Sequence, residues 1–134
     1  MTQPVSFGVV EMAVADHLSA KLSERGDSTP VFNEVPHQRP ARFVLVLRIG
    51  GAESNLITDS PRLVAECHDP YGPAAANLAD TVRALIKASA PGWAGGMWVD
   101  RANISSVVYS PDPATNTPRY LVYAELRTRG SVLT

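Results

Sequence analysis

The sequence lacks the features by which several protein classes are recognised. Its 134 residues include one cysteine, Cys67, which excludes an internal disulfide and favours a reducing compartment. No apolar run approaches the about 20 residues that span a bilayer, and the N-terminus lacks the basic and long apolar regions of a signal peptide. The net charge of −1 argues against the basic stripe that a nucleic-acid-binding protein carries.

Signatures of catalysis and metal binding are also missing. The sequence contains no HExxH, CxxC, Walker, GxGxxG or GxSxG motif, and its three histidines fall in three different predicted elements. Cys67 and His68 are metal-binding residue types, but neighbours on a strand point to opposite faces and are not expected to share one ion. We therefore predict no catalytic residue, no metal, no ligand-binding site and no cofactor.

What the sequence does contain is strand periodicity. Residues 42–51 alternate between an apolar set and a mixed set, which predicts a central β-strand around which the rest of the chain packs. The apolar set is Phe43, Leu45, Leu47 and Ile49, and the mixed set is Arg42, Val44, Val46 and Arg48. Residues 62–68 and 119–129 also alternate, with Leu63, Ala65 and Cys67 sharing one face of the first of these strands.

Two further segments have the spacing of amphipathic helices. The first covers residues 9–25 and stops at Gly26; its apolar stripe is Val10, Ala13, Val14, Leu18 and Leu22. The second covers residues 74–89 and begins after Pro73; its stripe is Ala75, Leu78, Val82, Leu85 and Ile86. Each helix therefore has one apolar stripe with which it can pack against one face of a sheet.

The order of these elements predicts one α+β domain over residues 1–134. We expect an antiparallel or mixed sheet of about four or five strands with two helices packed on one face, and loose ends at residues 1–8 and 130–134. Val31 and Phe32 lie among prolines and predict an edge strand or an extended loop. Residues 50–61 form a linker longer than a tight hairpin turn, and residues 97–100, 103–110 and 119–129 predict strands, the last two as a hairpin.

Helices on one face leave the other face of the sheet open. That face is expected to carry Val44, Val46, Val64, Leu121 and Tyr123 beside Arg48, Glu66 and Glu125, unless the two faces are exchanged in one strand. A sheet face that exposes both apolar and charged side chains is unusual for a monomer. The pattern therefore indicates oligomerisation.

Residues 48–86 resemble the tail terminator, or tail-to-head joining, proteins of long-tailed bacteriophages. The resemblance is carried by a strand that ends in Arg-x-Gly-Gly, a polar loop that closes with Thr58-Asp59-Ser60-Pro61, an alternating strand and an alanine-rich helix. The predicted first helix and C-terminal hairpin fit the same layout. One departure is Cys67-His68, where such proteins often carry an aromatic residue.

The resemblance implies a structural virion protein and not an enzyme. Such proteins form a ring, usually a hexamer, that caps the tail tube, ends its polymerisation and joins it to the head connector. The implied partners are other copies of the chain, the tail tube protein and a head–tail connector or neck protein, with no membrane and no direct nucleic-acid recognition. The implied location is the tail or neck of the virion, assembled in the bacterial cytoplasm.

Two loops and two sheet positions are the candidate interface. We expect Arg48 and Glu66 to pair across the joint between subunits, and residues 53–59 and 112–116 to reach the tube or connector; solvated loops are the alternative. The candidate residues are Arg48, Glu53, Asn55, Asp59, Glu66, Asp112, Thr115 and Asn116. Two other functions stay open: another neck or head-completion protein of the same virion, or a small α+β ligand-binding module or enzyme with a pocket near His68 and Asp69.

Overall fold

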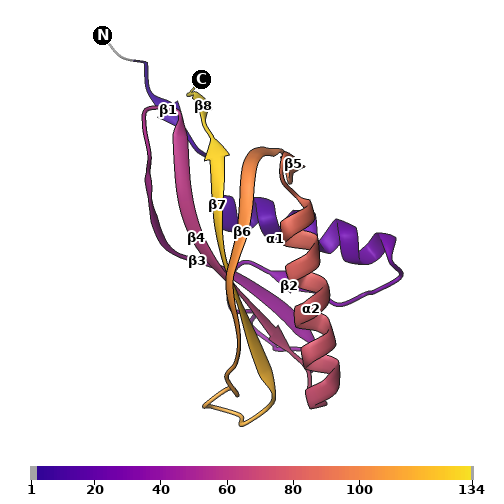
Figure 1. The fold of residues 1–134 in the computed structure, drawn as a ribbon. Helices are drawn as coiled ribbons and strands as arrows, with labels where there is room; N and C mark the ends of the chain where they lie inside the picture. Colours follow the sequence, from indigo (N-terminus) through magenta and orange to yellow (C-terminus); the bar gives the residue numbers. More distant parts are fainter. Residues whose placement is uncertain (1–2, 134) are drawn as a thin grey trace.

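The computed structural model describes residues 3–133 and has an α+β architecture (Figure 1). Its strands and helices, in chain order, are β1 (Val5–Ser6), α1 (Val10–Glu24), β2 (Val31–Phe32), β3 (Phe43–Glu53), β4 (Thr58–His68), α2 (Gly72–Ala88), β5 (Gly92–Ala94), β6 (Met97–Tyr109), β7 (Arg119–Arg129) and β8 (Ser131–Val132). Within this range six strands form one mixed sheet in the order β2-β3-β4-β7-β6-β5. Only the pairing of β2 with β3 is parallel among the pairings described.

The predicted α+β class is confirmed, but the predicted count of four or five strands is too low. Within this sheet, the strand that the sequence pattern missed is β5, which has three residues and pairs with the start of β6. A strand this short contains too few positions for alternation to be visible. The strands predicted at residues 97–100 and 103–110 are one continuous β6, in which bulges at two places interrupt the alternation.

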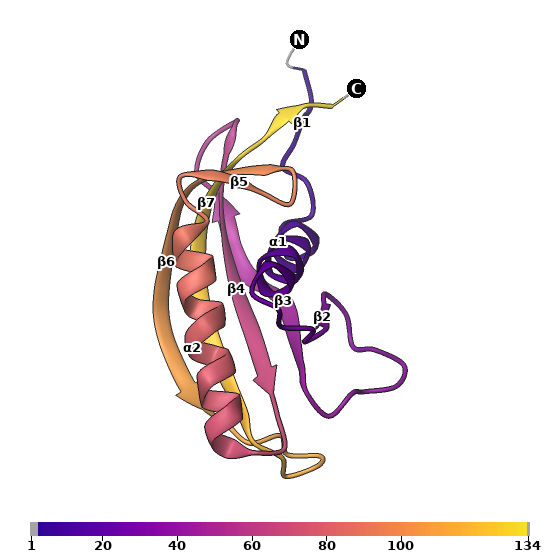
Figure 2. The same cartoon turned by 90° about the vertical axis from the view of Figure 1, so that its right-hand side faces the viewer.

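Both helices cover the same face of the sheet (Figure 2). α2 runs along the strands and α1 runs across them, as the two ribbon views show together. All five predicted stripe residues of α1 are buried, and so are those of α2 except Leu85, which is half-buried. No helix in the described part of the chain is long and apolar enough to cross a membrane.

The two faces of β3 are exchanged relative to the prediction. Val44 and Val46 are 0% exposed and lie in the core beneath the helices, while Phe43, Leu45 and Leu47 lie on the open face. The register explains this, because Val44 pairs with Cys67 and Val46 pairs with Ala65, whose side chains already face the helices. Alternation shows which residues share a face, but it does not show which face is covered.

The linker predicted at residues 50–61 is mostly strand. β3 extends to Glu53 and β4 begins at Thr58, so the turn between them covers residues 54–57. The glycine pair does not form the turn: Gly50 and Gly51 pair with Arg62 and Pro61, directly after a bulge at Ile49 where the register shifts. Gly51 has φ +90°, and a Cβ there would collide with the Ser60 carbonyl oxygen, so this position requires glycine.

The two ends of the chain, which the sequence predicts to be loose, form a small sheet with each other. Val5 lies opposite Val132 in the small antiparallel sheet of β1 and β8, and the Leu133 N–H donates to the Pro4 carbonyl oxygen at 2.8 Å. Both termini therefore lie at the same end of the molecule (Figure 1). The prediction for residues 1, 2 and 134 falls outside the described residues.

Candidate interaction surface

The molecule has two ends, at opposite ends of the long strands. The terminal end comprises β1, β8, the β3–β4 turn and the β5–β6 turn; the loop end comprises residues 33–41 and 110–118 (Figures 1 and 2). They are separated by the length of β7, which has 11 residues and spans roughly 33 Å. The candidate interface residues divide between these ends.

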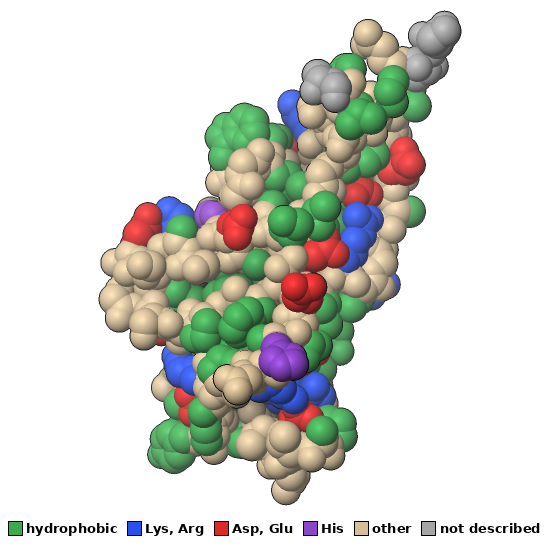
Figure 3. Space-filling model, turned by 180° about the vertical axis from the view of Figure 1, so that it is seen from behind, with side chains coloured by type: hydrophobic (Ala, Val, Ile, Leu, Met, Phe, Trp, Pro, Cys, Tyr) green, Lys and Arg blue, Asp and Glu red, His purple; other side chains and the backbone are tan. Residues whose placement is uncertain are grey.

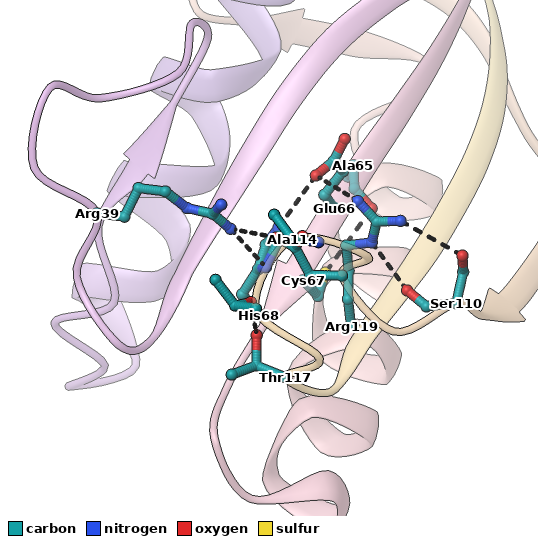
Figure 4. Close-up of polar contacts among 11 residues, drawn as sticks. Arg39, Ala65, Glu66, Cys67, His68, Ser110, Ala114, Thr117 and Arg119 are labelled. Carbon is teal, nitrogen blue, oxygen red and sulfur yellow. Dashed lines mark hydrogen bonds and ion pairs between the residues drawn. The ribbon is translucent and has the colours of Figure 1, made fainter.

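At the loop end, charged side chains gather on the open face of the sheet (Figure 4). They come from four separate segments: Arg39 from the segment before β3, Glu66 and His68 from β4, Asp112 from the β6–β7 loop, and Arg119 from β7. We call these five residues the loop-end cluster. Two of them, Glu66 and Asp112, are candidate residues from the sequence.

Arg39 is the centre of this cluster. Its guanidinium group donates to Asp112 Oδ2 at 2.6 Å and lies 3.4 Å from His68 Nδ1. Because a guanidinium only donates, Nδ1 must accept, which places the imidazole proton on Nε2. His68 Nε2 then donates to Glu66 Oε1 at 3.0 Å. The His68 ring also stacks on Phe43, with 4.2 Å between the ring centroids. Its orientation is therefore fixed by this stacking and by the contacts of its two ring nitrogens.

Both carboxylates of the cluster are stabilised in their charged form. The hydrogen bond from His68, followed by the positive charge of Arg119, lowers the pKa of Glu66 although burial opposes this. The hydrogen bond from Arg39, followed by that from the Ala114 N–H, lowers the pKa of Asp112. The cluster therefore ties residues 33–41 and 110–118 to the sheet by charge-assisted bonds.

A small cavity lies beside the cluster. It has a volume of about 250 Å³, below the roughly 300–1,000 Å³ of typical ligand pockets. Arg39, Glu66 and Asp112 line it and are already engaged in the bonds described above. Asp69, which the ligand-binding alternative places with His68, instead pairs with Arg42 at 3.0 Å. Among residues 3–133 no group of three or more His, Cys, Asp or Glu side chains is placed to hold a metal ion.

The terminal end differs in chemistry. Arg48 and the buried Asp59 form an ion pair of 3.2 Å, and the Arg48 Nε donates to the Gly50 carbonyl oxygen at 3.1 Å. Large apolar side chains are exposed around them, namely Leu56, Ile57, Trp93, Val132 and Leu133. A larger cavity of about 520 Å³ lies here, lined in part by Phe7, Trp93, Trp98 and Arg129.

The structure divides the candidate residues by end. Arg48, Glu53, Asn55 and Asp59 lie at the terminal end, and Glu66, Asp112, Thr115 and Asn116 lie at the loop end. Arg48 and Glu66, expected to pair between subunits, each have a partner within the chain. The alternation in β4 signalled that Glu66 and His68 share a face, but no sequence pattern connects Arg39 or Arg119 to them.

The sheet has an unpaired edge on each side. β2 pairs with β3 only at Val44 and Leu45, so residues 46–53, which pair with β4 on one side, have no strand partner on their outer side within residues 3–133. On the other side β5 pairs with β6 at residues 97–99, and residues 100–109 likewise lack an outer partner in the described chain. Both strands contain bulges, but neither contains the lysine or proline that commonly blunts an edge.

The surface seen from behind mixes side-chain types (Figure 3). Hydrophobic side chains there are interspersed with acidic and basic ones instead of forming a field of one charge. Comparison with models of known protein families and with curated proteins finds no match to this sequence. The two open edges and the two unlike ends are therefore the features that bear on function.

Proposed function

We propose that this chain is a structural subunit that assembles into a ring, a hexamer by the resemblance described above, and that the ring caps the tail tube of a long-tailed bacteriophage. The observation that carries the proposal is the pair of unpaired sheet edges, residues 46–53 of β3 and residues 100–109 of β6, on opposite sides of the subunit. A subunit with a different adhesive surface on each side associates head to tail. Such a heterologous association forms a ring when the rotation between copies closes.

The two unlike ends support the capping role. In a ring whose axis runs along the strands, the terminal ends of all copies face one way and the loop ends face the other. One ring surface would present Leu56 and Trp93, and the opposite one would present the charged loops. A tail terminator needs two different surfaces. One surface must bind the tail tube, and the other must bind the head connector without allowing further tube protein to add.

The chemistry of the loop-end cavity supports a structural function over a catalytic one. A substrate entering there would have to displace the bonds that hold Arg39 to Asp112 and Glu66 to His68. Breaking such charge-assisted bonds is costly. By the resemblance, the location that we propose is the virion tail or neck, and the proposed partners are other copies of the chain, the tube protein and a connector protein.

Two measurements test the proposal. Light scattering on the purified protein should give a ring mass near six times that of the monomer; a strict monomer at high concentration would refute the ring. Electron micrographs of particles assembled without this chain should then show over-long tails. Tails of normal length that fail to attach to heads would instead assign the protein to the neck or to head completion.

A further inference from the structure

We infer that the ring joint is a continuous antiparallel sheet, in which residues 100–107 of β6 in one copy pair with residues 46–52 of β3 in the next. This inference deepens the proposed function and rests on it. It follows from the direction of the two edge strands, from the height at which each edge is free, and from the side chains that each edge presents.

The strand directions suit such a joint. Three antiparallel pairings separate β3 from β6 in the sheet, β3 with β4, β4 with β7, and β7 with β6, so the two edge strands run in opposite directions. When copies stand side by side in a ring with the same orientation, β6 of one copy runs antiparallel to β3 of its neighbour. The joint would therefore continue the hydrogen-bonding pattern of the sheet without reversing a subunit.

The free stretches also lie at the same height along the strands. Following the register across the sheet, Val46 is level with Val107, and Glu53 is level with Val99. β2 blocks the β3 edge only at Val44 and Leu45, below this window, and β5 blocks the β6 edge only up to Val99, above it. A second copy can thus approach between the two short strands without displacing either.

The side chains that border the two edges are complementary. Near the lower part of the window, the β6 edge exposes Val107 and Val108, and the β3 edge presents the half-buried Leu47 and the exposed Ile49. Apolar groups would therefore meet apolar groups across the joint.

Disulfide trapping tests this register. Ala52→Cys and Arg101→Cys together place one thiol on each edge at the same height, while the native Cys67 is buried and burial raises its pKa to about 12, so it does not compete. Oxidation should give a ladder of covalent oligomers that ends at the ring size. The matched control, Ala52→Cys with Ser106→Cys, separates the thiols by roughly 15 Å along the strands and should not form the ladder.

The outcomes separate the joint from the function. A two-fold joint of β3 with β3 would link the Ala52→Cys variant into dimers, and one of β6 with β6 would link the Arg101→Cys variant. Dimers of either single-cysteine variant would refute the inference. A ring by light scattering without a ladder would refute this joint while leaving the ring in place. A ladder that closes, in a protein whose removal does not lengthen tails, would uphold the joint and refute the terminator role.

Discussion

The loop end and the terminal end of this molecule are stabilised in different ways. At the loop end, side chains from distant segments interlock: Arg39 bonds to Asp112 across 73 positions of sequence, and His68 stacks on Phe43. At the terminal end, main-chain pairing of β1 with β8 holds the chain, and Trp93 and Leu56 remain about 70% exposed. The first arrangement buries its side chains within the chain, while the second leaves apolar side chains exposed.

At the loop end, other segments of the same chain already cover part of the open face of the sheet. Phe43 and Leu45 are only 2% and 4% exposed although they lie on the face of β3 opposite to Val44 and Val46, which pack in the core with the helices. Arg39 lies over the Phe43 ring at 5.2 Å, and Phe32 packs against it edge-on. Adhesion between copies is therefore expected at the edges of the sheet and not over the loop end of its open face.

The largest effect is expected from removing the buried aromatic ring of Phe43 at the loop end, and it contrasts with the loss of an exposed ring at the terminal end. Phe43→Ala should lower the free energy of unfolding by about 3–5 kcal/mol, because it removes a buried ring and leaves His68 without its stacking partner. Trp93→Ala should cost about 1 kcal/mol or less, because that ring is exposed and contacts mainly Trp98. Urea unfolding of both variants measures the contrast, and equal losses would remove the distinction between the ends.

A smaller effect is expected from the ion pairs. Asp112→Asn should destabilise the protein by about 1–3 kcal/mol, because it leaves the Arg39 guanidinium without its charged partner in a partly buried site. The control is Asp100→Asn at the terminal end, whose partner Arg129 is exposed, and it should have the smaller effect. Hydrogen exchange should show faster opening of residues 110–118 in the first variant only.

The smallest effect is expected from acid at the loop end. The pKa of Glu66 and that of Asp112 are lower in the folded chain than in the unfolded chain, so below about pH 4.3 the unfolded state binds more protons. Their contribution to stability is present above that pH and is lost as the pH falls through the folded pKa values. Unfolding midpoints measured between pH 7 and pH 3 should fall less steeply in the Glu66→Gln, Asp112→Asn double variant; an unchanged slope would contradict this.

Much of the local structure could be predicted from the residues themselves. β7 occupies Arg119–Arg129 as its alternation predicts, and α1 buries its whole predicted stripe. Cys67 and His68 point to opposite sides of β4 as expected, since Cys67 lies in the core and His68 bonds to Glu66 on the open face. These features depend on neighbours three or four positions away at most, so a linear pattern contains them.

The loop-end cluster could not be predicted in this way. Arg39 and Arg119 lie in segments whose local patterns say nothing about a shared partner, and they meet only because the register places His68 beside Arg119. The alternation that predicts a pairing of Arg48 with Glu66 does not show which end of the sheet each residue occupies. The ion pair of Arg48 with Asp59 follows from the β3–β4 register, and that of Glu66 with Arg119 follows from the β4–β7 register.

By itself the sequence determined the α+β class, the two amphipathic helices and the residues that share a face in each long strand, because hydrophobic periodicity is a local property. The tertiary structure alone decided which face of β3 lies beneath the helices, which ends of the sheet are covered, and where its edges stay open. Those outcomes depend on register and packing between segments far apart in the chain. No periodicity along one segment records them.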